Sequence, residues 1–596
     1  MKLTVPGFLL IALPVFALIS SCAKVSSPSG GPRDREPPVV VKSNPPSGTV
    51  NFRGKSIAVT FNEFVVLDRI NDKFMVSPPM NTRPRIYIRR KNIIIDLEDQ
   101  LKDSTTYTFY FQDAVRDLNE GNPINNFQFV LSTGPVIDSL SVTGRVYNAF
   151  NLEVPENTLV LLYGQLDDTA VVKQLPDYIT RLEPNGAFRI DNVRGGAYRL
   201  YALKDIDNTK NYNLPDEEFA FCDTIIDITP ERHYLPRKEE PAPVSPGTDK
   251  NAVIPEAEGE YTLILFQAEK TQRYLTSSAR QLPYKLVYTL SLPPDTMNFE
   301  FSVPDTDREK YLIETTRNRD TVTVWLTDST LYNQAILNTV VRYPFTDSTG
   351  TNDYRRDTIQ MRFLQPRAAR VKPARTPFRV STGIVSGQLK PGAPLTLKSE
   401  TPFRTPDTSR IRIYELSESG RKGLPYKLTR DTLTFCRYFL EADLRQGRNY
   451  LYITDSHAFG NIYGDYSDSA GVKFSLRSPE SYGMLTMNVL NHTGKRIVQL
   501  LDNRETVIRE IYMDQDGSAE FPLLEKGFYR VRAIYDLNGD GKWTTGDFFS
   551  GRQPEPVSYY PGEIEIPVNW RVEQEWDLEL KNYKKQQLRA RRTPGR

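Results

Sequence analysis

Histidine and cysteine are scarce in this sequence, with three of each among 596 residues. Histidine is the commonest general acid and base, and zinc sites are built mostly from cysteine and histidine, so this scarcity argues against both kinds of site. Neither sign of charge is in excess: 76 basic residues balance 74 acidic ones, a net charge of +2 that does not suit a general nucleic-acid binder. The sequence also lacks a P-loop, Gly-x-Ser-x-Gly, His-Glu-x-x-His and a Rossmann glycine run, and we expect no enzyme.

Long apolar runs are also missing, apart from one at the N-terminus. Residues 3–19 follow a basic Met1-Lys2 pair and are too few for a membrane-spanning helix but typical of a secretory signal peptide. The run ends in Ile19-Ser20-Ser21-Cys22, which resembles the lipobox of bacterial lipoproteins. The resemblance implies a signal peptide at 1–21 and an acylated Cys22 that holds the chain to a membrane. The alternative is an ordinary signal peptide followed by an unmodified cysteine.

Residues 22–38 are rich in Ser, Pro and Gly and are expected to form a flexible tether. Their pattern Cys-x-x-x-x-x-Pro-Ser-Gly-Gly-Pro-x-Asp resembles the start of a family of lipoproteins from the Bacteroidota, which implies a lipid-anchored protein of the outer membrane. In that phylum, acidic residues directly after the cysteine often mark export to the cell surface. The first acidic residue here is Asp34, so the periplasmic face and the cell surface both remain open.

A tripeptide, Asp-[Ser/Thr]-[Ala/Ile/Leu/Met/Val/Thr], occurs eleven times, where ordinary composition would give about two or three. It resembles the periplasmic O-glycosylation acceptor of the same phylum. The alternative is turn and cap chemistry, in which Asp-Thr pairs are common. The candidate O-glycosylation sites are Ser104, Ser139, Thr169, Thr224, Thr296, Thr321, Ser329, Ser348, Thr358, Thr432 and Ser469.

Tyrosine (32) and phenylalanine (29) are abundant, and turn residues are frequent, which favours β-structure. From residue 39 to 134, runs such as Ile57, Val59 and Phe61 alternate with polar residues, and this pattern predicts a β-sandwich. The runs Asn44-Pro45-Pro46-Ser47-Gly48 and 127–134 (FQFVLSTG) resemble the bacterial Ig-like domain first described in S-layer proteins. The resemblance implies a seven-stranded spacer or adhesion module without catalytic residues.

An internal repeat links residues 138–229 with 482–580. Both copies have an Asn-Gly or Asp-Gly hairpin turn, then Gly-x-Tyr-Arg at Gly196 and Gly527, then an Asp-rich loop. This shared order of turn, motif and loop resembles carboxypeptidase-regulatory-like or collagen-adhesin B-type modules. The resemblance implies that both copies are prealbumin-like sandwiches.

The remaining segments complete an all-β chain of serial sandwiches joined by Pro-rich linkers. Cys222 and Cys436 fall in different expected domains, and free thiols are the favoured state. The expected segments are a Pro-rich linker or insertion at 230–260, a sandwich at 261–363, a linker at 364–378, a sandwich at 379–478 and a basic tail at 581–596.

Oxygen-bearing residues recur at alternate positions of a twelve-residue loop, 536–547. Asp536, Asn538 and Asp540 occupy positions 1, 3 and 5, with glycine at position 6. Loops with this spacing wrap Ca²⁺, so calcium is the possible cofactor, with the Lys542 carbonyl and the Asp547 carboxylate completing the set. Position 12 is Asp and the flanks look like strands, which departs from an EF-hand; the alternative is an Asx-turn loop. The first copy of the repeat lacks the glycine and carries, at the matching positions, Asp205, Asp207, Thr209 and Asp216.

Two further sets of residues could have a functional role but also have a structural interpretation. Adjacent Asp455, Ser456 and His457 point in different directions from one strand or loop, so they do not make a catalytic triad. Aromatic side chains could line a glycan or protein-binding face, or pack in the sandwich cores. The aromatic residues in question are Tyr482, Tyr559, Tyr560 and Trp570.

Together these features predict a non-catalytic outer-membrane lipoprotein that acts as a structural or interaction subunit. Its expected partners are membrane lipid, through Cys22, and an outer-membrane protein complex for assembly, export or uptake; no nucleic acid is expected. The alternative is a cell-surface adhesin or glycan-binding lipoprotein.

Overall fold

The part of the chain that the structure describes folds into five β-domains in series. Each α-helix in the described part is four residues long, and no helix there is long and apolar enough to cross a membrane. The expected all-β class is confirmed. The predicted signal peptide, Cys22, most of the predicted tether and of both Pro-rich segments, and the basic tail lie outside the described residues. The computed structural model describes residues 34–233, 261–294, 298–347, 349–363, 378–491 and 494–578.

Domain 1 is a sandwich of two sheets, ordered β1-β2-β6-β5 and β4-β7-β9, with a further pair β3-β8. Side chains alternate across a strand, so Ile57, Val59 and Phe61 all point inward from β2 and are at most 1% exposed. Its elements are β1 (Val40–Asn44), β2 (Ser56–Phe61), β3 (Val65–Leu67), α2 (Ile70–Lys73), β4 (Met75–Ser77), β5 (Arg85–Arg89), β6 (Asn92–Asp96), β7 (Thr106–Gln112), β8 (Val115–Asp117) and β9 (Phe127–Ser132).

Domain 2 has the strand path β12-β11-β14-β15-β17-β10-β13, and β16 pairs with β14. Its last strand, β17, pairs in parallel with β10 and antiparallel with β15. The domain boundary expected at Tyr261 is therefore wrong: β17 completes domain 2, and the Pro-rich segment 230–260 is an insertion within it. Its elements are β10 (Leu140–Asn148), β11 (Leu159–Tyr163), α3 (Ala170–Lys173), β12 (Tyr178–Arg181), β13 (Ala187–Val193), β14 (Gly196–Lys204), β15 (Glu218–Phe221), β16 (Ile226–Ile228), α4 (Pro230–His233) and β17 (Tyr261–Gln267).

Domain 5 repeats domain 2 strand for strand. Its sheets are β36-β35-β38-β39, with β40 on β38, and β37-β34-β41, in which the last strand again pairs in parallel with the first. In both domains the tyrosine of Gly-x-Tyr-Arg donates its hydroxyl to the carbonyl four residues earlier, at Tyr198 (3.1 Å) and Tyr529 (2.7 Å). The sequence repeat is thus a structural repeat. Its elements are η4 (Pro479–Ser481), β34 (Gly483–Leu490), β35 (Arg496–Leu501), β36 (Val507–Met513), β37 (Gly517–Leu524), β38 (Gly527–Tyr535), β39 (Val557–Tyr559), β40 (Ile564–Ile566) and β41 (Arg571–Asp577).

Domain 3 is a sandwich of the sheets β18-β19-β22-β21 and β20-β23-β24. Its fully buried aromatic residue Tyr288 donates to Thr339 Oγ1 across the core at 2.9 Å. Its elements are β18 (Leu275–Leu282), β19 (Lys285–Leu290), β20 (Glu300–Ser302), η1 (Arg308–Lys310), β21 (Tyr311–Thr315), β22 (Thr321–Leu326), α5 (Ser329–Tyr332), β23 (Ile336–Thr346) and β24 (Asn352–Arg362).

Domain 4 is a sandwich of the sheets β25-β27-β31-β30 and β26-β33-β32-β28-β29. Phe378, which the sequence places in the linker, is 7% exposed and belongs to this core. Its elements are β25 (Ser381–Thr382), β26 (Gln388–Leu389), β27 (Leu395–Lys398), η3 (Thr408–Arg410), β28 (Ile411–Ser417), β29 (Gly420–Gly423), β30 (Tyr426–Arg430), β31 (Arg437–Ala442), β32 (Asn449–Thr454) and β33 (Ala470–Leu476).

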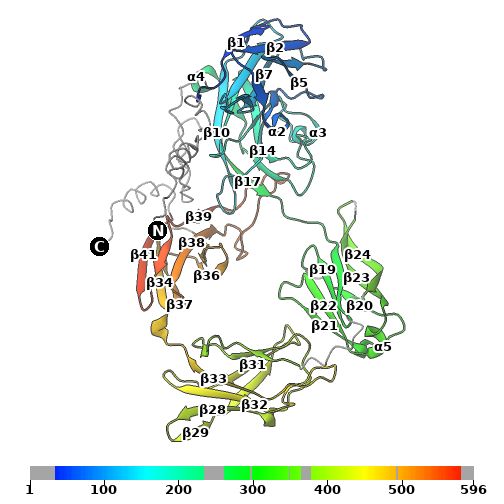
Figure 1. Ribbon diagram of the computed structural model, residues 1–596, viewed down its shortest axis with the longest axis vertical. Coiled ribbons are helices and arrows are strands. Elements are labelled where there is room, and N and C mark those ends of the chain that lie inside the picture. The colour runs from blue at the N-terminus through cyan, green and yellow to red at the C-terminus, as the bar shows by residue number, and fades with distance from the viewer. Residues whose placement is uncertain are drawn as a thin grey trace, which may run out of the picture.

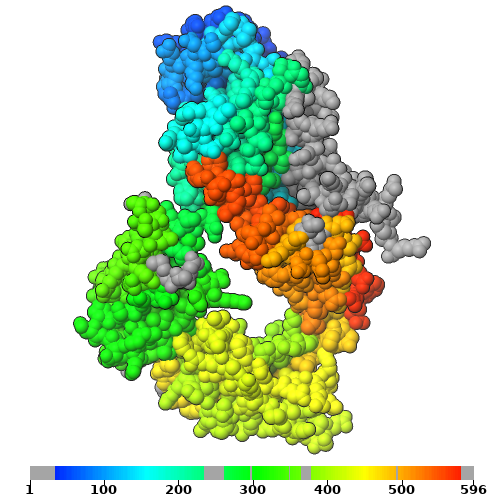
Figure 2. All heavy atoms as spheres, turned by 180° about the vertical axis from the view of Figure 1, so that it is seen from behind, coloured from blue at the N-terminus to red at the C-terminus, as the bar shows by residue number. Residues whose placement is uncertain are grey.

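Domains 2 to 5 form a closed ring, and domain 1 is stacked on domain 2 outside it (Figure 1). The Tyr463 ring lies 4.3 Å from that of Tyr284, joining domain 4 to domain 3. Arg477 at the end of domain 4 pairs with Glu525 of domain 5 at 2.6 Å. Domain 5 then returns to domain 2, and Figure 2 shows the opening that domains 3, 4 and 5 surround.

Cys222 and Cys436 are both free thiols. Burial, together with the nearby Glu314 carboxylate, raises the pKa of Cys436 to about 12. The thiolate is the reactive form, so we expect iodoacetamide to leave Cys436 unmodified in the folded protein at pH 8 and to modify it in urea. Mass spectrometry of the peptide containing Cys436 checks this, and complete alkylation of the folded protein within minutes would contradict it.

Candidate functional site

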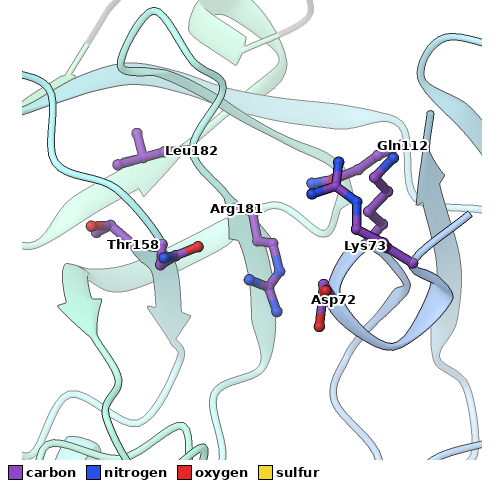
Figure 3. A pocket seen from close by; sticks show the side chains of 8 residues that line it. Asp72, Lys73, Gln112, Thr158, Arg181 and Leu182 are labelled. Atoms are coloured by element: carbon purple, nitrogen blue, oxygen red, sulfur yellow. The ribbon is translucent and has the colours of Figure 1, made fainter. Parts of the chain in front are cut away.

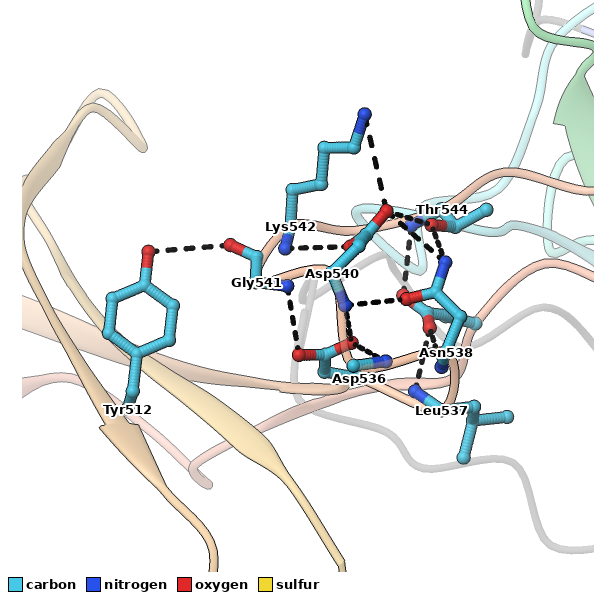
Figure 4. Close-up of polar contacts among 10 residues, drawn as sticks. Tyr512, Asp536, Leu537, Asn538, Asp540, Gly541, Lys542 and Thr544 are labelled. Atoms are coloured by element: carbon cyan, nitrogen blue, oxygen red, sulfur yellow. Dashed lines mark hydrogen bonds and ion pairs between the residues drawn. The ribbon is translucent and has the colours of Figure 1, made fainter.

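The Asp-rich loop of domain 5 joins β38 to β39 and is built around the buried carboxylate of Asp536. One oxygen of Asp536 accepts hydrogen bonds from the N–H groups of Gly539 (2.7 Å) and Asp540 (3.1 Å), and the other from Gly541 (3.0 Å) (Figure 4). Gly539 and Gly541 have φ of 75° and 76°, which glycine adopts without strain. The loop therefore turns tightly around one carboxylate.

A second buried carboxylate, Glu555, closes the same loop and was not identified in the sequence. It is 4% exposed. Its Oε1 accepts from Leu537 N (2.7 Å) and its Oε2 from Thr544 N (2.9 Å). Asp547, expected at loop position 12, accepts from Phe549 N instead (3.1 Å). Residue spacing alone selected Asp547, whereas the strand that follows places Glu555 under the loop.

The loop of domain 2 has the same plan. Glu217 is fully buried and accepts from Ile206 N and Leu214 N, both at 3.1 Å. Asp216, the expected twelfth position, turns away and pairs with Lys270 at 3.0 Å. A glutamate just before the strand that pairs with the second half of the Gly-x-Tyr-Arg strand, β15 in domain 2 and β39 in domain 5, is therefore common to both copies. Aligning the copies beyond their loops would have identified it.

The two loops differ in their capacity for a cation. In domain 2, single oxygens of Asp205, Asp207 and Glu217 all lie within 4.8 Å of one another. Burial, then the adjacent Asp207 charge, raises the pKa of Asp205. In domain 5 the central residue is Asn538, whose amide donates to Asp540 at 3.2 Å. Each loop thus holds three carboxylates, but among the described residues only those of domain 2 come close enough together to offer a hard divalent cation a shared site, and in both loops backbone N–H donors already satisfy carboxylates, as in Asx-turns.

The loop of domain 5 also carries the contact that closes the ring. We call residues 543–553 the closing segment. Within it, Thr545 donates to Gln267 O of domain 2 (2.7 Å), and Gln553 donates to Phe221 O (3.0 Å). Phe548 is 7% exposed and inserts into the domain 2 core, with its ring 4.9 Å from that of Phe219. Its first five residues belong to the loop predicted from the sequence, whereas residues 548–553 had no predicted role.

The histidines of the described part do not form a catalytic site. His233 is 5% exposed and contacts the Tyr261 hydroxyl through Nε2 at 3.1 Å. Ser456 Oγ lies 2.8 Å from His457 Nδ1, but the Asp455 carboxylate pairs with Arg412 and not with the imidazole. A nucleophile and a base without an orienting third group lack the arrangement of a triad.

The predicted surface residues fall into distinct environments. Of the aromatic residues considered for a binding face, Tyr482 and Tyr559 are buried, whereas Trp570 is 66% exposed. Tyr560 packs against the domain 5 core. Among the possible glycosylation sites, Thr321 is half-buried, and Thr296 and Ser348 lie outside the described residues. The exposed ones are Ser104, Ser139, Thr169, Thr224, Ser329, Thr358, Thr432 and Ser469.

The two-sheet sandwich of domain 1 agrees with a comparison of its sequence with protein families. Residues 34–133 match the bacterial Ig-like domain. Domain 1 is therefore a bacterial Ig-like domain. The match covers this Ig-like domain, and no curated protein matches the chain.

Several solved structures are similar to parts of the chain at low scores. Domains MG0-NIE-MG1 of Escherichia coli alpha-2-macroglobulin are 12% identical over 49% of this chain and 97% of that one, with a TM-score of 0.18. The S-layer protein rSbsC(31-844) is 11% identical over 83% and 65%, with a TM-score of 0.13. The pilin subunit BcpA of Bacillus cereus is 10% identical over 47% and 94%, with a TM-score of 0.14. Scores this low do not establish a shared overall arrangement.

Proposed function

We propose that this chain is a non-catalytic, lipid-anchored subunit of the outer membrane that presents a ring of β-domains to a protein complex. The observation that carries the proposal is the closure of domains 2 to 5 through the closing segment, which fixes their relative positions. A chain that served only as an extended spacer would not require its domains to close into a ring. A fixed ring instead suits a scaffold that holds other proteins in defined positions.

The order of the segments supports this role. An acyl group on Cys22 would fix one end to the membrane, and the tether would place the Ig-like domain at a distance from the lipid. Beyond it, the ring offers sheet edges to a partner. The outermost strand of one domain 3 sheet, β24, is eleven residues long and carries exposed Arg355 and Arg356. A partner strand with acidic side chains could add to such an edge by β-augmentation.

The test is purification of the tagged, lipidated protein from native membranes in mild detergent, followed by mass spectrometry. We expect an outer-membrane barrel protein in near-stoichiometric amount. A Cys22→Ala variant, which cannot be acylated, serves as the control and should lose the membrane fraction. A monomer without partners, accessible to protease on intact cells, would contradict the proposal and support an adhesin or glycan-binding lipoprotein instead.

A further inference from the structure

A polar cavity of about 220 Å³ lies where the Ig-like domain meets domain 2. The Ig-like domain contributes residues of α2 and the end of β7, and domain 2 contributes the start of β11 and the end of β12. Figure 3 shows Arg181 of β12 reaching into the space between Thr158 on one side and Asp72 and Lys73 on the other. None of the residues that line it belongs to the acidic loops or to the closing segment.

The Arg181 guanidinium is the feature that most needs a ligand. Its Nε is buried and has no hydrogen-bond partner among the described residues. Three other arginines in the described part, Arg116, Arg437 and Arg496, have a buried Nε of the same kind. In each of those, another guanidinium nitrogen is bonded, to Asp113, Asp431 and the Lys495 carbonyl respectively. No such bond is present for the half-buried Arg181 among the described residues, and a partly desolvated charge without a hydrogen-bonded partner is costly.

The charges around Arg181 offset this cost only in part. Desolvation by burial lowers the pKa of Arg181, and Arg83 is a like charge nearby, whereas Asp72 and Asp205 act in the opposite direction without forming an ion pair with it in the described part. Arg83 already donates to the carbonyls of Ile70 and Asn71, at 2.7 and 2.8 Å. Lys73 is held by Asp68 and Asp113, so it does not offer a free charge.

The other residues that line the cavity are mostly polar, and three of them have an unusual backbone conformation. Arg69, Gln112 and Asn157 all line it and all have positive φ, of 46°, 52° and 53°. Side chains other than glycine, asparagine and aspartate rarely adopt this conformation, and such residues gather at ligand sites. The amides of Gln112 and Asn157 and the Asp72 carboxylate are groups that bind hydroxyls.

We propose that this cavity binds a small acidic sugar, with its carboxylate on the Arg181 guanidinium. An arginine matches a carboxylate with two parallel hydrogen bonds. The ring hydroxyls lie against Asp72, Gln112 and Asn157, and Leu182 provides an apolar contact for the ring. The volume is below the roughly 300–1,000 Å³ of sites for drug-sized ligands, which limits the ligand to about one monosaccharide.

Isothermal titration calorimetry of the full chain tests the proposal, with galacturonate as the probe. We expect a dissociation constant of about 1 mM or lower, and no binding of uncharged galactose at the same concentrations. Arg181→Gln should weaken galacturonate binding at least about tenfold, which is typical for the loss of a charge-assisted pair. Thermal melting confirms that the variant is folded.

Two further variants keep the test decisive if Arg181→Gln is unstable. Gln112→Glu places a negative charge in the cavity without removing Arg181 and should also weaken binding at least about tenfold. Arg53→Gln is the matched control, because it removes a positive charge from the exposed Arg53–Asp103 pair of the Ig-like domain and should bind as the wild type does.

Three outcomes would overturn the proposal. If galacturonate does not bind at about 10 mM, ten times the expected dissociation constant, the cavity is not a binding site for it. Binding that Arg181→Gln and Gln112→Glu leave unchanged places the sugar elsewhere. Binding of inorganic phosphate without galacturonate shows an oxyanion site that does not accept a sugar. None of these depends on a partner complex, so the proposed scaffold function stands or falls separately.

Discussion

Replacing Phe548 by alanine is expected to open the ring. The Phe548 ring is 7% exposed and lies 4.9 to 5.7 Å from the rings of Phe219, Phe221 and Tyr201 in domain 2. Truncation of a buried phenylalanine costs about 3–5 kcal/mol. Two kinds of contact remain. The hydrogen bonds of Thr545 and Gln553 each contribute only about 1 kcal/mol, and Phe150 of domain 2 still packs against Trp543 of domain 5. We therefore expect the ring to open in part of the molecules.

Small-angle X-ray scattering measures this opening as a larger radius of gyration and a longer maximum dimension. Phe549→Ala is the matched control, since the neighbouring ring is 73% exposed and should leave the scattering unchanged. A Phe548→Ala protein with the scattering of the wild type would show that the closing segment does not depend on this side chain.

Glu555→Ala is expected to release the Asp-rich loop of domain 5. Glu555 accepts hydrogen bonds from the backbone N–H groups of Leu537, Asn538 and Thr544. A hydrogen bond to a charged group contributes about 1.5–3 kcal/mol, so loss of these three part-buried bonds should lower the local free energy of opening by at least about 3 kcal/mol. The loop leads directly into the closing segment, and ring closure should weaken with it.

Hydrogen–deuterium exchange of peptides covering residues 536–557 measures the change, because a five-domain chain need not unfold in two states. We expect at least a hundredfold faster exchange there, which is the rate equivalent of about 3 kcal/mol. Glu565→Ala on the solvent side of β40 is the control, and exposed substitutions of this kind change stability by less than about 0.5 kcal/mol. Unchanged exchange in Glu555→Ala would mean that the Asp536 carboxylate holds the loop alone.

Local patterns predicted the domains well because each sandwich buries one face of its strands. The alternation of Ile57, Val59 and Phe61 gave the correct inner face, and the two Gly-x-Tyr-Arg motifs identified two domains that match strand for strand. The boundary at Tyr261 failed for a physical reason. Alternation in β17 shows that the strand has one buried face but not which sheet covers it, and its partner β10 lies more than a hundred residues earlier.

The sites were harder to predict because their residues come from separate segments. Asp536, Asn538 and Asp540 are close in sequence and were identified together, but Glu555 joins them only after the chain has turned back. The sugar cavity is a stronger case, since Arg69 and Arg181 belong to different domains. Neither residue has a sequence neighbour that marks it as functional.

Ring closure also imposes an order on the folding of the protein. Domain 2 is complete once β17 has been made, but the closing segment that covers Phe219 and Phe221 is about 280 residues further along the chain. Until domain 5 has folded, this aromatic surface of domain 2 has no cover. The partly folded chain therefore exposes an apolar surface at Phe219 and Phe221. We expect a holding chaperone to be needed most after domain 2 has folded and before domain 5 has folded.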